Sequence, residues 1–344
     1  MEYGCTEHLA SPLRGRALEE LKSLLTKTGL TYAPGIQHTA LVRDPEGRII
    51  ATASLEDNVI KCVACDPGHQ GEDLTAVVLT ALRRKALEEG RRHLFLYTKP
   101  GNVPLFAGLG FYEVARAGEA ALMEDRRDGF VGWAESVRAP GAAGRIGALV
   151  MNCNPMTLGH RYLVKRAAAE CDFLYIFIVS EDKSAVSAAD RLALIRASLE
   201  GIHSVAVAGT GAYLISSATF PDYFLKDKAR SGQVWTELDA AVFCRLAQRL
   251  GIVCRFVGSE PFCPVTAAYN RTLAQALPEH GIELTELPRL ERDGSPISAT
   301  AVRELVRAGR WEDIRPLVPL PVYEWFSCEE NRARFLKRAS DISG

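Results

Sequence analysis

The stretch that decides the fold is IGALVMNCNPMTLGH, residues 146–160. Its first six residues form an apolar run that predicts a buried strand, and its end, Gly159 and His160, precedes a helical pattern. Glycine lets the backbone approach a ligand closely, and the free amides at a helix start attract phosphate. The loop has neither the lysine of a Walker loop nor the glycine spacing of a dinucleotide fingerprint. We therefore predict a phosphate-handling loop of another kind.

Around this stretch, the second half of the chain alternates short apolar runs with helical patterns. Strands are predicted at residues 146–151, 173–179, 204–208, 253–257 and 282–287, and helices are predicted to begin near Gly159, Ala188, Thr236, Val265 and Ser298. This alternation predicts a parallel sheet with helices on both faces. Ligands of such sheets bind at the carboxyl ends of the strands, so the first strand-to-helix connection is the expected site.

The first half has a different pattern, which includes a hairpin around a Pro-Glu-Gly turn. Helices are predicted at residues 15–28 and from Leu74 onward, and strands at residues 39–43, 48–54, 59–65 and 93–97. A small-residue stretch at 139–144 separates the halves, and 344 residues are enough for two cores. We predict one α/β domain at residues 1–140 and a parallel-sheet α/β domain at residues 145–344.

Composition excludes several classes of protein. The chain is 47% apolar and 24% charged with a net charge of -1, which indicates neither a nucleic-acid surface nor a disordered tail. No apolar run is long enough to span a membrane. The first twelve residues lack the basic start and apolar core that are typical of a signal peptide, so none is expected. Nine scattered cysteines favour free thiols and a cytoplasmic location. Only Cys62 and Cys65 have metal-ligand spacing, and they lack a second pair, so no protein metal site is predicted.

Two motifs carry a resemblance to a known family. Residues 157–160, Thr-Leu-Gly-His, resemble the (His/Thr)-x-Gly-His motif of the nucleotidyltransferase superfamily, and residues 297–303, ISATAVR, resemble its downstream phosphate-binding motif. A histidine at a helix start, or Ser-x-Thr before an apolar helix, is by itself usually only a cap. Both motifs, in this order and with the strand series between them, favour a nucleotide site.

The resemblance implies a role for each matching residue. His160 would donate a hydrogen bond to the α-phosphate of ATP, and Thr157 replaces a histidine with a neutral hydroxyl. Positive charge would then come from His160, Arg303, Lys183 and Mg²⁺. The candidate catalytic residues are His160, Thr157, Arg303 and Lys183. The candidate nucleotide-binding residues are Asn152, Cys153, Asn154, Gly159, Gly258, Glu260, Ser298 and Thr300.

Three further segments, residues 180–184, 218–226 and 258–270, are similar to segments of the citrate lyase ligase family, and the similarity spans essentially the whole chain. It implies that ATP and acetate form acetyl adenylate, and that the acetyl group passes to a thiol. That thiol would belong to the phosphoribosyl-dephospho-coenzyme A arm of the acyl-carrier subunit of citrate lyase. The sequence leaves open a malonate decarboxylase carrier, a nucleotidyltransferase of cofactor synthesis with a sensor domain, and a non-enzymatic coenzyme A or nucleotide sensor.

The first half resembles the Gcn5-related acetyltransferase fold through two segments, residues 66–75 and residues 109–112. The first occupies the place of that family's pyrophosphate loop, so Gln70, Gly71 and Thr75 are candidates for binding the coenzyme A arm. Asp73 departs from the family because it would face an anionic pyrophosphate. We therefore expect this half to hold the arm or to dock the carrier, and not to catalyse acetyl transfer from acetyl-coenzyme A.

Overall fold

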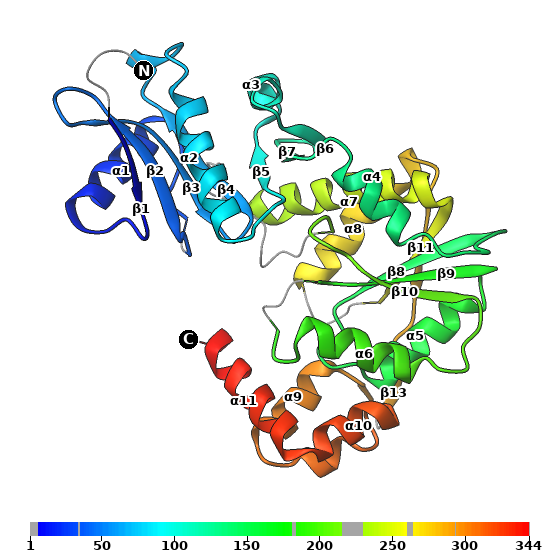
Figure 1. The fold of residues 1–344 in the computed structure, drawn as a ribbon. Coiled ribbons are helices and arrows are strands. Elements are labelled where there is room, and N and C mark those ends of the chain that lie inside the picture. Colours follow the sequence, from blue (N-terminus) through cyan, green and yellow to red (C-terminus); the bar gives the residue numbers. More distant parts are fainter. Residues whose placement is uncertain are drawn as a thin grey trace. The chain divides into compact units, whose positions relative to one another are not determined.

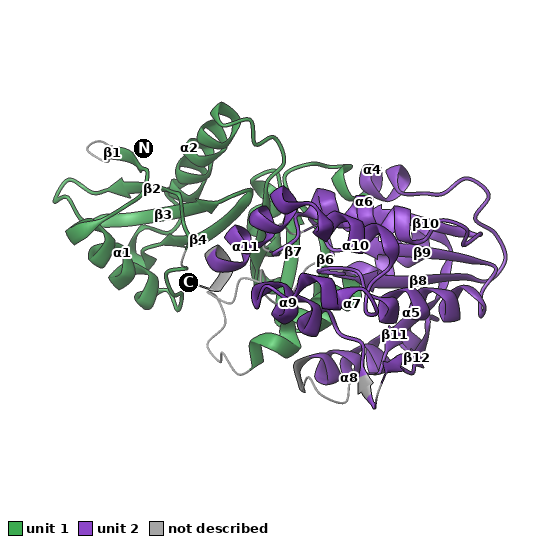
Figure 2. Ribbon diagram, turned by 90° about the horizontal axis from the view of Figure 1, so that it is seen from below, with its two compact units in different colours: residues 1–130, 219–241 green, residues 131–218, 242–344 purple. Residues whose placement is uncertain are grey.

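The computed structural model describes residues 6–33, 35–180, 184–214, 230–259, 264–292 and 294–343. The chain divides into two compact units, which Figure 2 colours separately. Unit 1 comprises residues 1–130 and 219–241, and unit 2 comprises residues 131–218 and 242–344. The predicted boundary between residues 140 and 145 lies within unit 2 and stays a prediction about which segments fold independently.

Unit 1 is built on a mixed sheet, and its described strands run in the order β1-β2-β3-β4-β5-β7-β6 (Figure 1). Neighbouring strands are antiparallel except β4 and β5, whose parallel ladder has two pairs, Val59 with Phe95 and Ile60 with Leu96. The strands are β1 (Thr6–Ala10), β2 (His38–Arg43), β3 (Ile49–Glu56), β4 (Val59–Cys65), β5 (Phe95–Thr98), β6 (Tyr112–Ala117) and β7 (Ala120–Glu124). The helices are α1 (Gly15–Lys27), α2 (Leu74–Glu88) and α3 (Val103–Gly108), with short 3-10 turns at Pro67–His69 and Pro100–Asn102.

The core of unit 1 lies between the sheet and α2. β3 buries its first seven residues, and α2 buries Val78 and Leu82 against the same cluster. The apolar runs of β2, β3 and β4 predicted these strands. β7 was not predicted, because its sequence, AALME, is typical of helices. All five of its residues are buried between β5 and β6, so tertiary packing overrides local preference.

Unit 2 contains the predicted parallel sheet, and its described strands run in the order β10-β9-β8-β11-β12. β8 is central and comes first in the chain, so the chain winds outward from it in both directions. In sheets with such a reversal of strand order, ligands bind at the carboxyl end of the strand where the order reverses, which here is β8. The strands are β8 (Ile146–Met151), β9 (Phe173–Ile178), β10 (Val205–Gly209), β11 (Ile252–Gly258) and β12 (Glu283–Leu287), with a small hairpin of β13 (Glu291–Arg292) and β14 (Ser295–Pro296).

Helices cover this sheet and extend its core towards the carboxyl terminus. Those that lie wholly or mostly in unit 2 are α4 (Gly129–Ser136), α5 (Leu158–Ala168), α6 (Ala188–Ser198), α8 (Pro264–Glu279), α9 (Ala299–Arg307), α10 (Leu320–Ser327) and α11 (Glu329–Ser343), with a 3-10 turn at Trp311–Ile314. The helix α7 (Ser231–Leu250) is shared, because residues 231–241 belong to unit 1 and residues 242–250 to unit 2. Phe326 of α10 and Phe335 of α11 are fully buried in the cluster that also holds Leu149 of β8. Each such side chain contributes about 1.5–3 kcal/mol through burial. The carboxyl-terminal helices are therefore part of the core that supports the central strand.

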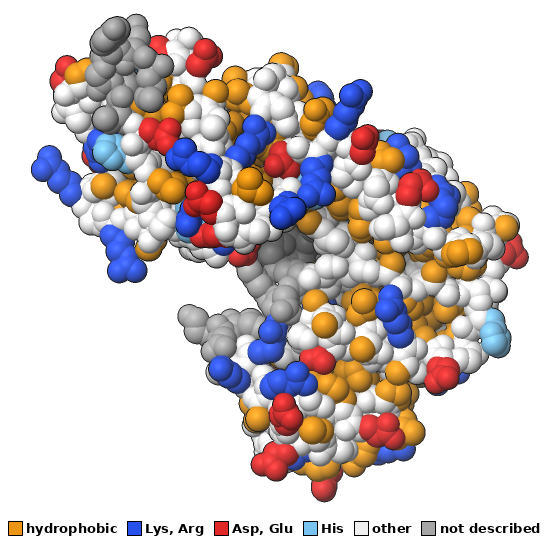
Figure 3. All heavy atoms as spheres, in the orientation of Figure 1, with side chains coloured by type: hydrophobic (Ala, Val, Ile, Leu, Met, Phe, Trp, Pro, Cys, Tyr) orange, Lys and Arg blue, Asp and Glu red, His pale blue; other side chains and the backbone are white. Residues whose placement is uncertain are grey.

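Charged side chains of both signs are interspersed on the face that Figure 3 shows. This distribution agrees with the balance of 41 basic and 42 acidic residues in the sequence. Within the described ranges, no helix combines the length and the apolar character that crossing a bilayer requires.

Candidate active site

The predicted loop lies where the sheet places it, between the end of β8 and the start of α5. Thr157 is the N-cap of α5, and its hydroxyl accepts a hydrogen bond from the backbone N–H of His160 at 3.2 Å. In return, the backbone N–H of Thr157 donates to Nδ1 of His160 at 3.0 Å. This reciprocal cap satisfies two amides that a helix start leaves open. It also fixes the imidazole of His160 against its own loop.

The cap determines the tautomer of His160. A backbone N–H only donates, so Nδ1 is an acceptor and the ring proton is assigned to Nε2. Burial, followed by the positive charge of Arg289, lowers the pKa of His160 to about 4. At neutral pH the half-buried ring is therefore uncharged and offers a single N–H donor. His160 contributes a hydrogen bond to the site and no positive charge.

The second motif meets the first although the two are far apart in sequence. Ser298 is the N-cap of α9, and its hydroxyl accepts from the backbone N–H of Ala301 at 3.1 Å. Arg303 donates from Nη1 to the backbone oxygen of Asn154 at 2.8 Å and from Nη2 to the Thr300 hydroxyl at 2.9 Å. The guanidinium of Arg303 therefore lies between the loop after β8 and the start of α9.

Close backbone packing also joins the two motifs. A Cβ atom added at Gly159 would lie 2.8 Å from the backbone oxygen of Ile297, the residue before Ser298. Any larger residue at position 159 would push the motifs apart. Packing against the backbone of Ile297 therefore requires glycine at position 159, and the predicted close approach of this glycine to a ligand stays a prediction.

The residues between β8 and Thr157 are held by hydrogen bonds and burial. Asn152 accepts from the buried guanidinium of Arg191 through both its backbone and side-chain oxygens, and Asn154 Oδ1 accepts from the backbone N–H of Val186 at 3.0 Å. Cys153 has a φ of 49° and is buried, which raises the pKa of its thiol to about 12. Cys153 therefore shapes the backbone and is no nucleophile.

Two more strands contribute residues at the same edge of the sheet. Gly258 ends β11, and its carbonyl accepts from Asn270 Nδ2 at 3.1 Å. Arg289 follows β12, donates to the backbone oxygen of Ser259 at 2.6 Å, and acts electrostatically on His160. Sequence reasoning missed Arg289. Its position just after the last parallel strand could have indicated it as a site residue, because the carboxyl ends of parallel strands share one edge of the sheet.

The described part of the site consists of hydrogen-bond donors. His160 Nε2 and the guanidinium groups of Arg303 and Arg289 suit phosphate oxygens, whereas the N–H groups of Leu158, His160 and Ala301 at the starts of α5 and α9 already donate within the protein. The hydroxyls of Thr157 and Ser298 are already engaged in helix caps. The remaining predicted residues, Lys183 and Glu260, lie outside the described residues, as do residues 218–226 and 261–263.

The described residues fit Mg²⁺ that binds together with a nucleotide. The described loop and motif residues offer no carboxylate, and among the described residues no group of three or more His, Cys, Asp or Glu side chains could hold a metal. Mg²⁺ keeps several waters and is commonly bound through substrate phosphates. Any Mg²⁺ here would therefore be held mainly by the triphosphate, with the described residues binding the remaining oxygens.

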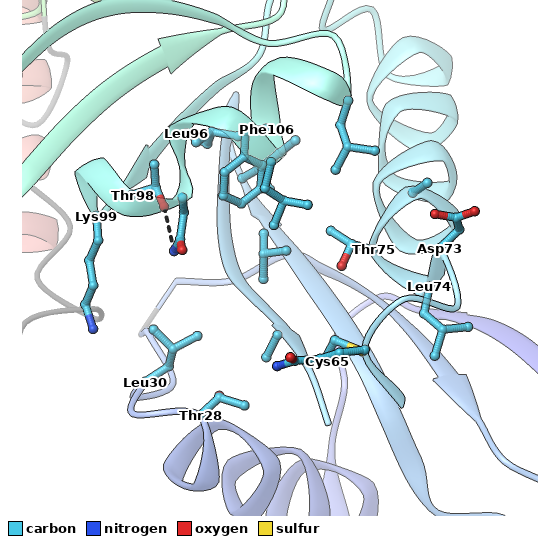
Figure 4. A pocket seen from close by; sticks show the side chains of 18 of the residues that line it. Thr28, Leu30, Cys65, Asp73, Leu74, Thr75, Leu96, Thr98, Lys99 and Phe106 are labelled. Carbon is cyan, nitrogen blue, oxygen red and sulfur yellow. Dashed lines mark hydrogen bonds between the residues drawn. The ribbon is translucent and has the colours of Figure 1, made fainter. Parts of the chain in front are cut away.

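The residues predicted to bind the coenzyme A arm line a separate pocket in unit 1 (Figure 4). Gln70, Gly71 and Thr75 form one side of this cavity of about 500 Å³. Gly71 has a φ of +94°, and Asp73, the N-cap of α2, has a φ of 54° and makes no side-chain cap hydrogen bond. The predicted departure at Asp73 thus coincides with an unusual backbone conformation for a residue that is not glycine.

The two sheets and the motif geometry define the class of protein: a nucleotidyltransferase-like α/β unit in one chain with an acetyltransferase-like unit. Residues 146–326 match the family described as the citrate lyase ligase C-terminal domain. Two relatives are the citrate (pro-3S)-lyase ligases of Klebsiella pneumoniae, 44% identical over 81% of this chain and 84% of the relative, and of Escherichia coli K12, 40% identical over 88% of each. The chain belongs to the citrate lyase ligase family.

A solved acyl-CoA N-acyltransferase from Pseudomonas aeruginosa is also similar to part of the chain. It covers 36% of this chain and 99% of its own, with 15% identity and a TM-score of 0.31. The strand order of unit 1, and not this likeness, defines its fold.

Proposed function

We propose that the chain uses ATP to activate acetate as acetyl adenylate and then transfers the acetyl group to the thiol of the acyl-carrier subunit of citrate lyase. Membership of the citrate lyase ligase family supports an acid-thiol ligase. The observation that carries the proposal is the joint position of the His160 N–H and the Arg303 guanidinium at the carboxyl end of β8. Donors of this kind stabilise the charge that develops on phosphate oxygens during in-line displacement, which supports the proposal.

In the first step a carboxylate oxygen of acetate attacks the α-phosphorus of ATP, and pyrophosphate leaves. Nε2–H of His160 donates to a nonbridging α-phosphate oxygen, and this bond strengthens as charge builds up on that oxygen. Arg303, with Thr300 beside it, binds the departing β- and γ-phosphates. When bound, Mg²⁺ neutralises part of the triphosphate charge. Lys183 and Glu260 remain proposed nucleotide contacts outside the described residues.

In the second step the carrier thiol attacks the acetyl carbonyl of the adenylate. A thioester forms, AMP leaves with the bonding electrons of the acyl–oxygen bond, and the thiol proton passes to solvent. We assign Gln70, Gly71 and Thr75 to binding the coenzyme A-derived arm that presents this thiol. The relatives are citrate (pro-3S)-lyase ligases, and this favours the citrate lyase carrier as the acceptor over a malonate decarboxylase carrier. It also favours this reaction over a role in cofactor synthesis.

The reaction requires a reduced acceptor thiol. The cysteines of the described residues are free: Cys62, Cys65, Cys153, Cys171, Cys244, Cys254 and Cys328. Free thiols are typical of a reducing compartment. We therefore place the enzyme in the cytoplasm.

Substitution of His160 tests the proposed role. His160→Ala should lower acetate-dependent pyrophosphate release from ATP by about 10²–10³-fold, as expected for the loss of one transition-state donor. The matched control is His203→Ala, because His203 is exposed and belongs to the same unit. Release that is undiminished in His160→Ala, or that does not depend on acetate in the wild-type protein, would refute the assignment.

A further inference from the structure

The pocket of unit 1 opens where two strands separate. Beyond Ile60 and Leu96, no ladder pair joins β4 to β5 in the described residues, although β4 continues to Cys65 and β5 to Thr98. Figure 4 shows Cys65, Leu96 and Phe106 around the resulting cavity, with Thr75 at the first turn of α2. At about 500 Å³ the cavity has the size of a typical small-molecule site.

The lining suits a slender ligand with amide groups. Strand edges that are not paired with each other can accept an extended chain between them, because such a chain supplies its own N–H and C=O groups. Thr98 and Asn102, which are hydrogen-bonded to each other at 3.3 Å, and Thr28 add neutral polar groups to a mostly apolar wall. The geometry favours an uncharged, extended ligand.

The loop that borders this pocket is acidic. Residues 66–73, DPGHQGED, contain three carboxylates and no lysine or arginine. Asp66 is paired with Lys27 at 3.1 Å and Glu72 with His69 at 3.1 Å, whereas Asp73 takes part in no ion pair among the described residues. Asp73 is exposed at the start of α2, where an anion would otherwise meet free amides.

Two carboxylates of this loop act on a thiol that lines the pocket. Burial raises the pKa of the Cys65 thiol, and the carboxylates of Glu72 and Asp66 raise it further. A potential that disfavours a thiolate also disfavours a phosphate at the same place. Lys99 is exposed like Asp73, but Figure 4 shows it on the opposite side of the pocket from Asp73 and the start of α2, so its charge acts at the other end of the cavity.

We infer that this pocket binds the uncharged pantetheine end of the carrier's arm and that the acidic loop, residues 66–73, disfavours free coenzyme A and other ligands that bring phosphate to the start of α2. The inference rests on the proposed function. In this arrangement the phosphates of the arm stay outside the pocket with the carrier. The loop thereby selects a protein-bound arm against the free cofactor.

Calorimetry on the full chain, with pantetheine and coenzyme A as probes, tests this selection. Pantetheine should bind at least as tightly as coenzyme A. Asp73→Asn should raise the affinity for coenzyme A by about 3- to 10-fold and leave pantetheine binding unchanged, because an exposed charge at this range has a modest effect. Asparagine tolerates the positive φ of residue 73. Asp128→Asn, the same charge change at an exposed site that does not line the pocket, should alter neither affinity.

A pocket-filling variant locates the binding. Ala76→Trp, on the pocket wall, should abolish pantetheine binding while the circular dichroism of the chain is retained. The inference would be overturned if the wild-type chain bound coenzyme A more tightly than pantetheine, or if it did not bind pantetheine. It would also be overturned if Asp73→Asn left the ratio of the two affinities unchanged. Acetate-dependent pyrophosphate release is measured in parallel. If the wild-type protein showed no acetate-dependent pyrophosphate release, the proposed function would be contradicted. If it showed this release but did not bind pantetheine, only the inference would be contradicted.

Discussion

The chemistry of the site depends on a reciprocal bond between two residues. Thr157 caps α5, and the same contact takes up Nδ1 of His160, so only Nε2 remains to meet a ligand. A charged imidazole would turn an N–H of its own towards the N–H of Thr157. His160 is therefore kept neutral by the geometry that positions it, which corrects the expectation from the sequence that His160 supplies positive charge; among the described residues of the site, Arg303 and Arg289 carry that charge.

This arrangement predicts a pH dependence of stability. The pKa of His160 is about 4 in the folded chain against 6.5 for a free histidine, so the unfolded state binds more protons between these values. The contribution of His160 to stability is complete above about pH 6.5 and is lost as the pH falls towards 4. Relative to His160→Gln, the wild-type chain should lose about 1–3 kcal/mol of unfolding free energy over this interval.

Urea unfolding of the two proteins at several pH values between 7 and 4 measures this difference. The comparison removes the contribution of every other titrating group that the two proteins share. A stability difference that stays constant with pH would show that the imidazole is not held neutral by the Thr157 contact.

At the same scale, the sequence predicted some residues of the site but not others. It predicted His160, Ser298 and Arg303, because a motif fixes local spacing and a helix start follows from it. It did not predict Arg289, whose approach to His160 depends on the pairing of β12 with β11, separated from the motif by more than a hundred residues. Nor did it predict the hydrogen bond to Nδ1, because a tautomer depends on three-dimensional contacts.

At the scale of elements, the site depends on two helix starts that touch. α5 begins after the central strand β8, and α9 begins after the last parallel strand. Gly159 permits the close approach of α5 to the backbone of Ile297, and Arg303 bonds across the same junction. The two helix starts therefore keep one spacing only if residue 159 has no side chain.

Gly159→Ala should therefore shift one motif against the other. A Cβ atom 2.8 Å from a backbone oxygen forces movement that we expect to cost about 1–3 kcal/mol of stability. Pyrophosphate release should fall about 10- to 100-fold, because the reacting groups lose their alignment. The control is Gly132→Ala in α4, where a Cβ meets nothing within 4 Å and stability should stay equal or rise by about 0.5–1 kcal/mol. Full activity in Gly159→Ala would contradict a fixed spacing.

The elements themselves were predictable where local pattern and packing agree. In unit 2, β8 and β9 are apolar, as parallel strands covered on both faces are, whereas the edge strand β12 contains two glutamates; all five parallel strands were predicted close to their observed positions. In unit 1, β6 and β7 were not predicted. β6 has the sequence YEVARA, without a regular alternation of apolar and polar residues, and β7 has a helical composition, so only the pairing of β7 with β5 and of β6 with β7 makes them strands.

At the scale of the whole molecule, each unit has its own core and its own proposed substrate. The buried cluster of unit 1 joins its sheet to α2, and that of unit 2 joins β8 and β9 to the carboxyl-terminal helices. The nucleotide residues described here belong to unit 2, and the pocket residues to unit 1. The two half-reactions should therefore respond separately to substitutions.

Ala76→Trp tests this separation in the complete reaction. Filling the pocket of unit 1 should lower acetyl transfer to the carrier at least 10-fold more than it lowers acetate-dependent exchange of pyrophosphate into ATP, because only the transfer step requires the arm. His160→Ala should lower both rates together, since no adenylate forms. Both rates are measured on the same preparations, with thioester formation followed by mass spectrometry of the carrier. Equal loss of the two rates in Ala76→Trp would show that the pocket serves adenylate formation as well, and would contradict the assignment of the arm to unit 1.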